Sequence, residues 1–385
     1  MQDLEVDALR EAPGAELVFA AVAGEPNVYV VGGAVRDALL HRRPKELDLV
    51  VEGDAIPVAR RAAARVNGAL LVHDRFKTAT ITADGIAFDL ASARKETYPR
   101  PGALPEVELG ATIEEDLARR DFTINAIAVP IDGDRVIEWP GGLQDLRNRT
   151  LRVLHERSFR DDPTRMLRLV RYAARLAFEI APDTRRLIDP RLTDTVSGDR
   201  LGNELRLALY EPATALELLE RTGLGPKLLG RDFHAVDYGL QGPLALAACC
   251  TKIPREQLTQ RLDHLGFRAS ERHVIVAAAT AFELLHNRLD VPDAELWRLL
   301  HHERPETAEL LAAAGDTGAR RWLDDVRHRR LEITGADLLA VGLTGSAVGA
   351  GLARATVAML EGMAPDRASQ LRAALTATPA AGPGA

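Results

Sequence analysis

A paired-glycine turn lies early in the chain. Gly32 and Gly33 stand between an apolar run and a helix-like segment that carries Arg36. Paired glycines let backbone N–H groups come close to a ligand, and the N-terminus of a helix favours phosphate. The surrounding residues match neither of the two common glycine-rich phosphate-binding motifs. The turn therefore indicates an anion site only together with other residues, and an ordinary strand–turn–helix is the alternative.

Three carboxylates accompany this turn. Glu46 and Asp48 are two residues apart on an expected strand, which places both side chains on one face. Like carboxylates repel each other unless a cation neutralises them, and Mg²⁺ is typically bound by one or two carboxylates with water and phosphate oxygens. Asp89 lies on another apolar run, where an unpaired charge is costly to bury. The set predicts two-metal phosphoryl chemistry, with a solvated strand face as the alternative for the first pair.

Two groups of arginines supply positive charge. Arg119 and Arg120 precede an apolar segment, and arginine suits bidentate phosphate contact. For Arg119 the alternative is a surface ion pair with Glu115, four residues earlier. Residues 147–206 hold 14 arginines against nine acidic residues, in a chain of net charge −7. Four of these arginines share one face of a predicted helix over residues 163–178: Arg165, Arg168, Arg171 and Arg175. This row needs anions or acidic partners, and a solvated basic face is the alternative.

Asp162, one turn before Arg165, allows a sharper inference. Cytosine and adenine each present an amine donor beside a ring-nitrogen acceptor. A carboxylate accepts from the amine and a guanidinium donates to the ring nitrogen. Uracil and guanine reverse this pattern. An Asp–Arg edge is therefore expected to accept C and A, and to reject U and G, without a nucleic-acid template.

The elements that must position these residues fall into two parts. Residues from about 27 to 140 mix short strands and helices, and the chain beyond about residue 150 is helical almost throughout. The expected strands are Val28–Val31, Leu47–Val51, Ala69–His73, Thr78–Thr82 and Ile86–Ala91. The expected helices of the first part are Ala34–Leu40 and Ala55–Arg65. The sequence thus predicts an α+β head followed by an elongated all-helical part.

Composition sets the broad class. The chain has 385 residues, of which 46% are hydrophobic and 27% charged, as in ordinary globular proteins. No apolar run approaches the ~18 residues of a membrane span, and the N-terminus lacks the apolar region of a signal peptide. The two cysteines, Cys249 and Cys250, are adjacent, so we expect a reducing, cytoplasmic compartment and no structural zinc. The negative net charge argues against a general polyanion binder and confines any nucleic-acid surface to a local patch.

Together, the segments GGAVRD, the acidic pair, ARKET, EEDLARRDFTINAIA and DDPTRMLRLVRY resemble the bacterial-type class II tRNA nucleotidyltransferases and the related poly(A) polymerases. The resemblance is dense from about residue 28 to 180, and ITGADLLAVGL near residues 333–343 extends it. It implies a polymerase-beta-like nucleotidyltransferase head with a mixed sheet, then a helical neck, body and tail. The expected boundaries are an N-terminal segment 1–26, head 27–150, neck 151–206, RNA-binding body 207–290, tail 291–375 and a disordered end 376–385.

The resemblance also implies roles for individual residues. Glu46 and Asp48 would hold Mg²⁺, with Asp89 as the third catalytic carboxylate. The other matching positions would bind the nucleotide: Gly32, Gly33, Arg36, Arg120, Asp162, Arg165, Arg168 and Arg171. Asp162 and Arg165 would read the base. The family's first metal carboxylate is usually Asp, so Glu46 is a departure, and Mg²⁺ is demanding in geometry.

The implied activity is Mg²⁺-dependent addition of CMP and/or AMP to the 3′ end of tRNA from CTP and ATP. The open alternatives are CC-only or A-only addition, poly(A) synthesis, a small-molecule nucleotidyltransferase and a non-catalytic RNA-binding relative. CC-adding relatives tend to have a reduced flexible loop, and residues 94–116 are not obviously shortened, which weighs against CC-only addition. No phosphohydrolase activity is expected. No membrane or protein partner is predicted.

Overall fold

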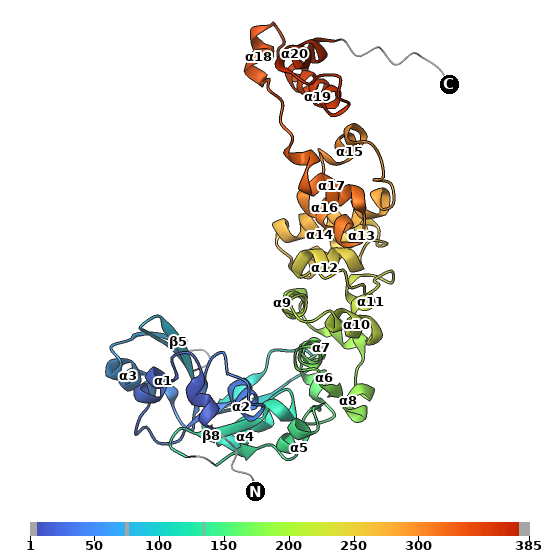
Figure 1. Ribbon diagram of the computed structural model, residues 1–385. Coiled ribbons are helices and arrows are strands. Elements are labelled where there is room, and N and C mark those ends of the chain that lie inside the picture. The colour runs from blue at the N-terminus through green and yellow to red at the C-terminus, as the bar shows by residue number, and fades with distance from the viewer. Residues whose placement is uncertain (1–5, 74–76, 134, 377–385) are drawn as a thin grey trace. The chain divides into compact units, whose positions relative to one another are not determined.

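The computed structural model describes residues 6–73, 77–133 and 135–376. The chain divides into two compact units, Met1–Leu224 and Gly225–Ala385 (Figure 1). The first contains every residue that the sequence assigns to a site. The neck, body and tail boundaries predicted above stay predictions, since this division tests none of them.

A seven-stranded mixed sheet forms the centre of the first unit, in the order β3-β4-β5-β2-β1-β8-β9. Its strands are β1 (Val28–Val31), β2 (Asp48–Val51), β3 (Ala69–His73), β4 (Thr78–Ala83), β5 (Ile86–Ser92), β8 (Ile127–Pro130) and β9 (Ile137–Glu138). The β2–β5 pair is parallel and places Asp48 opposite Asp89, whereas the other neighbouring strands of this sheet are antiparallel. The predicted α+β head with a mixed sheet is confirmed.

Glu46 does not lie on the strand that the sequence predicts for it. β1 and β2 pair with Val30 opposite Leu49, so the antiparallel register would set Leu47 against Gly32. Gly32 has φ 69° and turns the chain into the next helix, which ends the ladder. The strand therefore begins at Asp48, and Glu46 precedes it by two residues.

Helices cover this sheet and continue beyond it. The 3-10 helix η1 (Val6–Glu11) packs against α2 (Gly33–Leu39), and α1 (Ala15–Ala21) packs against α3 (Ala55–Arg65), so residues 6–21 pack on helices of the head. Asp54 caps the start of α3, because its side chain accepts a hydrogen bond from the Ile56 amide, and the alanine-rich face of this helix is buried. The helices are α1 (Ala15–Ala21), α2 (Gly33–Leu39), α3 (Ala55–Arg65), α4 (Ile113–Ala118), η2 (Thr123–Asn125) and α5 (Gly142–Arg147).

The rest of the first unit carries the arginine-rich helix. This helix is α7 (Thr164–Leu176), close to the predicted span, and it packs against α9 and α10. Its companions are α6 (Ser158–Asp161), α8 (Pro182–Arg186), η3 (Pro190–Thr195), α9 (Gly198–Ala208) and α10 (Thr214–Arg221). Two further strand pairs are β6 (Arg94–Thr97) with β7 (Glu106–Leu109), and β10 (Thr150–Leu151) with β11 (Glu179–Ile180).

Helices make up the second unit, as the sequence predicts. α11 (Leu224–Leu229) starts at the division between the units. The remaining helices are α12 (Gly242–Cys249), α13 (Arg255–His264), α14 (Ala269–Leu285), α15 (Asp293–Leu300), α16 (Pro305–Ala313), α17 (Thr317–Asp324), η4 (Val326–His328), α18 (Gly335–Ala340), α19 (Ser346–Leu360) and α20 (Arg367–Leu375). Within the described residues, no helix has the length and hydropathy to cross a bilayer. The predicted disordered end lies outside the described residues, except for Thr376.

Candidate active site

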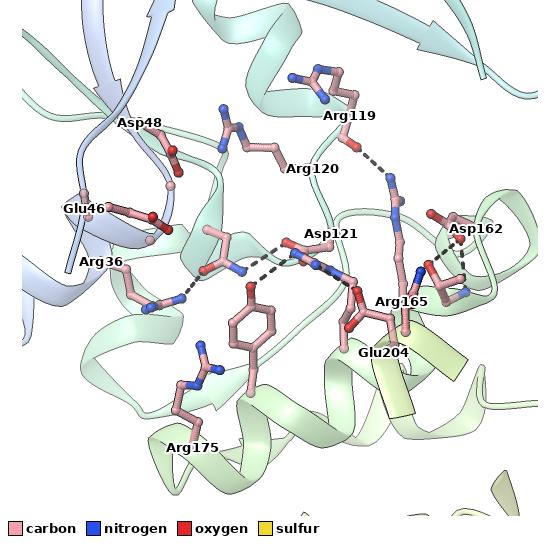
Figure 2. Close-up of a pocket in the computed structure, with 18 of the residues that line it drawn as sticks. Arg36, Glu46, Asp48, Arg119, Arg120, Asp121, Asp162, Arg165, Arg175 and Glu204 are labelled. Carbon is pink, nitrogen blue, oxygen red and sulfur yellow. Dashed lines mark hydrogen bonds and ion pairs between the residues drawn. The ribbon is translucent and has the colours of Figure 1, made fainter. Parts of the chain in front are cut away.

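A cavity of about 660 Å³ lies in the first unit, lined by the start of β2, by α2, by the residues that follow α4, and by α7 and α9. Figure 2 shows its arrangement: Glu46 and Asp48 lie on one side, Asp162 and Arg165 on the other, and arginines between them. Nine of the eleven residues that the sequence assigns to the site line this cavity: Gly32, Gly33, Arg36, Glu46, Asp48, Arg120, Asp162, Arg165 and Arg168. Asp89 and Arg171 do not line it.

The glycine turn brings the backbone close to two arginines. A Cβ atom on Gly32 would lie 2.8 Å from Nη1 of Arg120, so a side chain there would displace this guanidinium. Arg36 is only 4% exposed; its Nη1 donates to Oδ1 of Asn125 (2.7 Å) and its Nε to Oδ1 of Asp37 (2.8 Å). The turn therefore holds two positive charges at one wall of the cavity.

The carboxylates Glu46 and Asp48 line the cavity together. Glu46 and Asp48 are exposed to the cavity and lie side by side in Figure 2. Desolvation and the charge of Glu46 raise the pKa of Asp48, with a smaller contribution from Asp89. Asp89, in register with Asp48, accepts a hydrogen bond from the Thr80 hydroxyl (2.6 Å). The donors are thus hard oxygens whose mutual repulsion a divalent cation would relieve, and this set fits Mg²⁺. The described residues contain no cluster of three or more His, Cys, Asp or Glu side chains placed to hold a metal by themselves.

Arg119 and Arg120 share a buried partner on α4. Both form ion pairs with Asp116, which is 0% exposed, at 2.8 and 3.0 Å. Arg119 also pairs with Glu96 (2.9 Å). The alternative pair of Arg119 with Glu115 does not form, because Glu115 contacts Lys95 (2.7 Å) and caps α4. Asp116 faces the core side of this short helix, so it is the carboxylate that the arginines reach.

The two base-reading candidates, Arg165 and Asp162, have different hydrogen-bond partners. Arg165 is 5% exposed, and its guanidinium donates to the Ser158 hydroxyl (2.9 Å) and to the Arg119 carbonyl (2.7 Å). Both acceptors are neutral. Oδ1 of Asp162 accepts from the backbone N–H and hydroxyl of Thr164 (3.1 and 2.7 Å) and from Arg200 (2.9 Å). Its Oδ2 makes no hydrogen bond with any described residue, which leaves one carboxylate oxygen to accept from a ligand.

The rest of the arginine row is neutralised inside the protein. Arg168 pairs with Asp121 (2.8 Å) and Glu204 (3.3 Å), and Arg175 pairs with Glu211. Arg171 is 6% exposed and pairs with Glu204 and Glu211, so it supports the wall from behind. The predicted common helix face is confirmed, and the acidic partners that it needs come from Asp121, from α9 and from the residues that follow α9.

Several cavity residues were missed from the sequence. Asp121 and Asn125 are four residues apart and hydrogen-bonded to each other (3.1 Å), inside a segment that reads as merely apolar. Burial would raise the pKa of Asp121, but Arg168 and the Asn125 amide more than offset this and lower it. The ring centroid of Tyr172 lies 5.4–5.9 Å from four guanidinium carbons. An aromatic residue within the arginine row was the sequence signal that could have indicated these cation–π contacts. Burial raises the pKa of Tyr98, another lining residue, to about 12.

The loop between β6 and β7 reaches Asp162 through Arg200. Gly102, at φ 70°, donates its N–H to the Arg160 carbonyl (3.2 Å), and its own carbonyl accepts from Nη1 of Arg200 (3.2 Å). A Cβ at Gly102 would overlap the Thr195 carbonyl. This contact thus connects the loop to the carboxylate that Arg200 holds.

Gly102→Ala is therefore expected to cost more stability than Gly110→Ala. Gly110 lies just after β7 of the same ribbon at φ 84°, with nothing within 4 Å of its Cβ position. Both alanines carry a left-handed strain of about 1–2 kcal/mol, but only Gly102→Ala adds a backbone overlap of about 1–3 kcal/mol. Urea unfolding of the two variants measures the difference. Equal losses would show that Gly102 is not seated against Thr195 in solution.

The chain is similar to proteins of one known family. Residues 28–152 match the Poly A polymerase head domain. The chain is 39% identical over 353 residues to the A-adding tRNA nucleotidyltransferase of Halalkalibacterium halodurans, covering 82% of this chain and 80% of that protein. The chain belongs to the tRNA nucleotidyltransferase family. Relatives in this family also include CC-adding and CCA-adding enzymes.

Other tRNA nucleotidyltransferases show how far the likeness extends. The A-adding enzyme of Aquifex aeolicus is 44% identical over 201 residues, which is 50% of this chain but only 24% of that protein. The Thermotoga maritima CCA-adding enzyme complexed with tRNA_CCA aligns with a TM-score of 0.75 and 27% identity, over 97% of this chain and 98% of that one. The family and fold inferred from the sequence motifs are thus confirmed.

Proposed function

We propose that the protein is a template-independent RNA nucleotidyltransferase that adds CMP and/or AMP from CTP and ATP to the 3′ end of tRNA. One observation carries this proposal: a single cavity holds the carboxylates Glu46 and Asp48 on one side and the Asp162–Arg165 edge on the other. The first can hold a catalytic cation, and the second matches the amine and ring nitrogen shared by cytosine and adenine. The names of the relatives support tRNA as the acceptor.

The chain's own residues would bind and orient the nucleotide. Arg120 and the glycine turn, which line the cavity, would contact the triphosphate, and Arg36, which donates to Asn125, would support them. The free Oδ2 of Asp162 would accept from the base amine, while Arg165 would donate to the ring nitrogen. Arg168 keeps Asp121 ionised in the wall, so the site is fixed before the substrate enters.

Glu46 and Asp48 would hold Mg²⁺, with Asp89 beside them. The chemistry that a cation held there would supply is activation of the RNA 3′-hydroxyl and charge stabilisation of the leaving pyrophosphate. The longer side chain of Glu46 reaches the same cavity face as Asp48, although it starts two residues before the strand. Asp89, which does not line the cavity, is proposed to act through its charge beside Asp48.

A-only addition is the second candidate. Two relatives described above, at 44% and 39% identity, are A-adding enzymes. Residues 94–116, which are not obviously shortened, include the β6–β7 pair and its connecting loop, and this weighs against a CC-only enzyme. We place the reaction in the cytoplasm, which the two buried free thiols of Cys249 and Cys250 support.

Nucleotide addition to defined tRNA ends tests the proposal. The protein is incubated with Mg²⁺ and tRNA transcripts ending before, within and after the CC step, with CTP, ATP, UTP or GTP singly and with CTP and ATP together. Addition that stops at CCA indicates the full enzyme, whereas A alone on CC-ended tRNA indicates the second candidate. Long A tails indicate a poly(A) polymerase. Intact tRNA binding without incorporation indicates a non-catalytic relative.

Asp162→Ala is expected to erode base selection more than rate. The variant loses the acceptor for the base amine, so C and A lose about 1–3 kcal/mol of discrimination against U and G, or roughly 5- to 150-fold. Relative kcat/KM values for the four nucleotides on one tRNA measure this loss. Asp161→Ala is the neighbouring control, since Asp161 does not line the cavity. Unchanged selectivity in Asp162→Ala would remove the base-reading role.

A further inference from the structure

The exposed side of α9 continues outward from the active-site cavity. Asn203 lines the cavity, and Leu207 and Tyr210 follow it at positions four and seven residues later. This spacing places the three residues on one side of the helix and of the turn that extends it. The Tyr210 amide donates to the Leu207 carbonyl (3.3 Å), so the helical course continues as far as Tyr210.

Charged neighbours of Leu207 and Tyr210 contact residues that line the cavity. Arg206 donates to Oδ1 of Asn203 (2.5 Å). Glu211 directly follows Tyr210 and pairs with Arg175, which lines the cavity. Neither Leu207 nor Tyr210 lines the cavity; they continue outward along the side of α9 on which Asn203 lines it.

The two outer residues, Leu207 and Tyr210, are apolar and strongly exposed. Leu207 is 49% exposed and Tyr210 is 61% exposed. The Tyr210 hydroxyl makes no hydrogen bond with any described residue. Large apolar side chains left open at the mouth of a site are more often contact surface than packing. The residue types, an aromatic ring beside an aliphatic side chain near basic groups, are those that bind unstacked bases without sequence preference.

We propose that Tyr210, assisted by Leu207, is a stacking platform for an unpaired nucleotide at the 3′ end of the acceptor RNA. This inference rests on the proposed function, which requires an RNA 3′ end to enter the cavity. The platform grips the strand outside the nucleotide pocket, so it governs RNA binding and leaves CTP and ATP binding unchanged. It tolerates any base, because every base has a π face.

Fluorescence anisotropy with 5′-labelled tRNA transcripts, without added nucleotide, tests the platform. Tyr210→Ala is expected to raise the Kd for CC-ended tRNA about tenfold. Tyr210→Phe keeps the ring and should bind within about twofold of the wild type. Leu71→Ala is the matched control, since Leu71 is 60% exposed on β3 and does not line the cavity. A blunt acceptor end without unpaired nucleotides should bind wild type and Tyr210→Ala equally.

Two results would overturn the platform: an unchanged Kd in Tyr210→Ala, or an equal loss on blunt RNA. Thermal unfolding checks the fold, and Tyr210→Leu provides a second variant that keeps apolar volume without the ring and should also bind weakly. Ring-dependent RNA binding without incorporation by the wild type would overturn the proposed function alone. If the wild type incorporates nucleotides and Tyr210→Ala has the same KM for tRNA as the wild type, the platform alone would be overturned.

Discussion

Asp48→Ala is expected to lower nucleotide incorporation on the order of 10³-fold or more, because it removes a carboxylate that would hold the catalytic cation. The same change is expected to leave the fold intact. The raised pKa of Asp48 shows that its ionised form is disfavoured in the folded state, by desolvation first and then by Glu46. Asp48→Asn should therefore retain or raise the thermal unfolding midpoint at neutral pH while activity is lost.

Substitution of a functional carboxylate typically lowers activity while stability is kept or raised, whereas substitution of a structural carboxylate lowers both. Single-turnover incorporation and thermal unfolding of the same preparations measure the two quantities. Asp132→Asn is the control, since Asp132 is an exposed carboxylate in the turn after β8 and does not line the cavity. Activity of Asp48→Ala near that of the wild type would overturn the metal-holding role.

Local spacing was enough to predict much of the site. The glycine turn, the Glu46–Asp48 pair and the arginine row depend on residues within a few positions of each other, and the cavity contains members of all three. The strand boundary at Glu46 could not be predicted in this way, because it depends on the register of β2 against β1 and on the turn at Gly32.

The partners of the arginines were not predictable because they are distant in sequence. Glu204 is 36 residues from Arg168, and only the packing of α9 on α7 brings them together. Arg119 pairs with Asp116 rather than Glu115 because of the side of α4 that faces the core. A six-residue helix is too short for its hydrophobic periodicity to show this side. The β6–β7 ribbon was missed because its strands are charged and partly exposed.

Asp116→Asn is expected to lower the free energy of unfolding by about 3 kcal/mol at neutral pH, because it leaves Arg119 and Arg120 without their buried carboxylate. Asp116 is 0% exposed, and its Oδ1 also accepts from the Arg94 amide (3.3 Å). Glu114→Gln is the control: Glu114 lies on the same helix and is exposed. Urea unfolding measures the free energy of unfolding of both variants. Equal losses would show that the buried ion pairs of Asp116 contribute no more to stability than an exposed carboxylate does.

The pH dependence of stability separates the charge of Asp116 from its packing. Burial would raise the pKa of Asp116, but the charges of Arg119 and Arg120 more than offset this and lower it. A carboxyl group whose pKa is lower in the folded state stabilises the protein fully above its unfolded pKa of about 3.9, and this contribution is lost as pH falls through the folded value. Asp121, whose pKa is also lowered, contributes equally to wild type and variant. The stability difference between wild type and Asp116→Asn should therefore be constant above about pH 5 and shrink on acidification. A difference that stays constant down to the acid transition would assign the loss to packing alone.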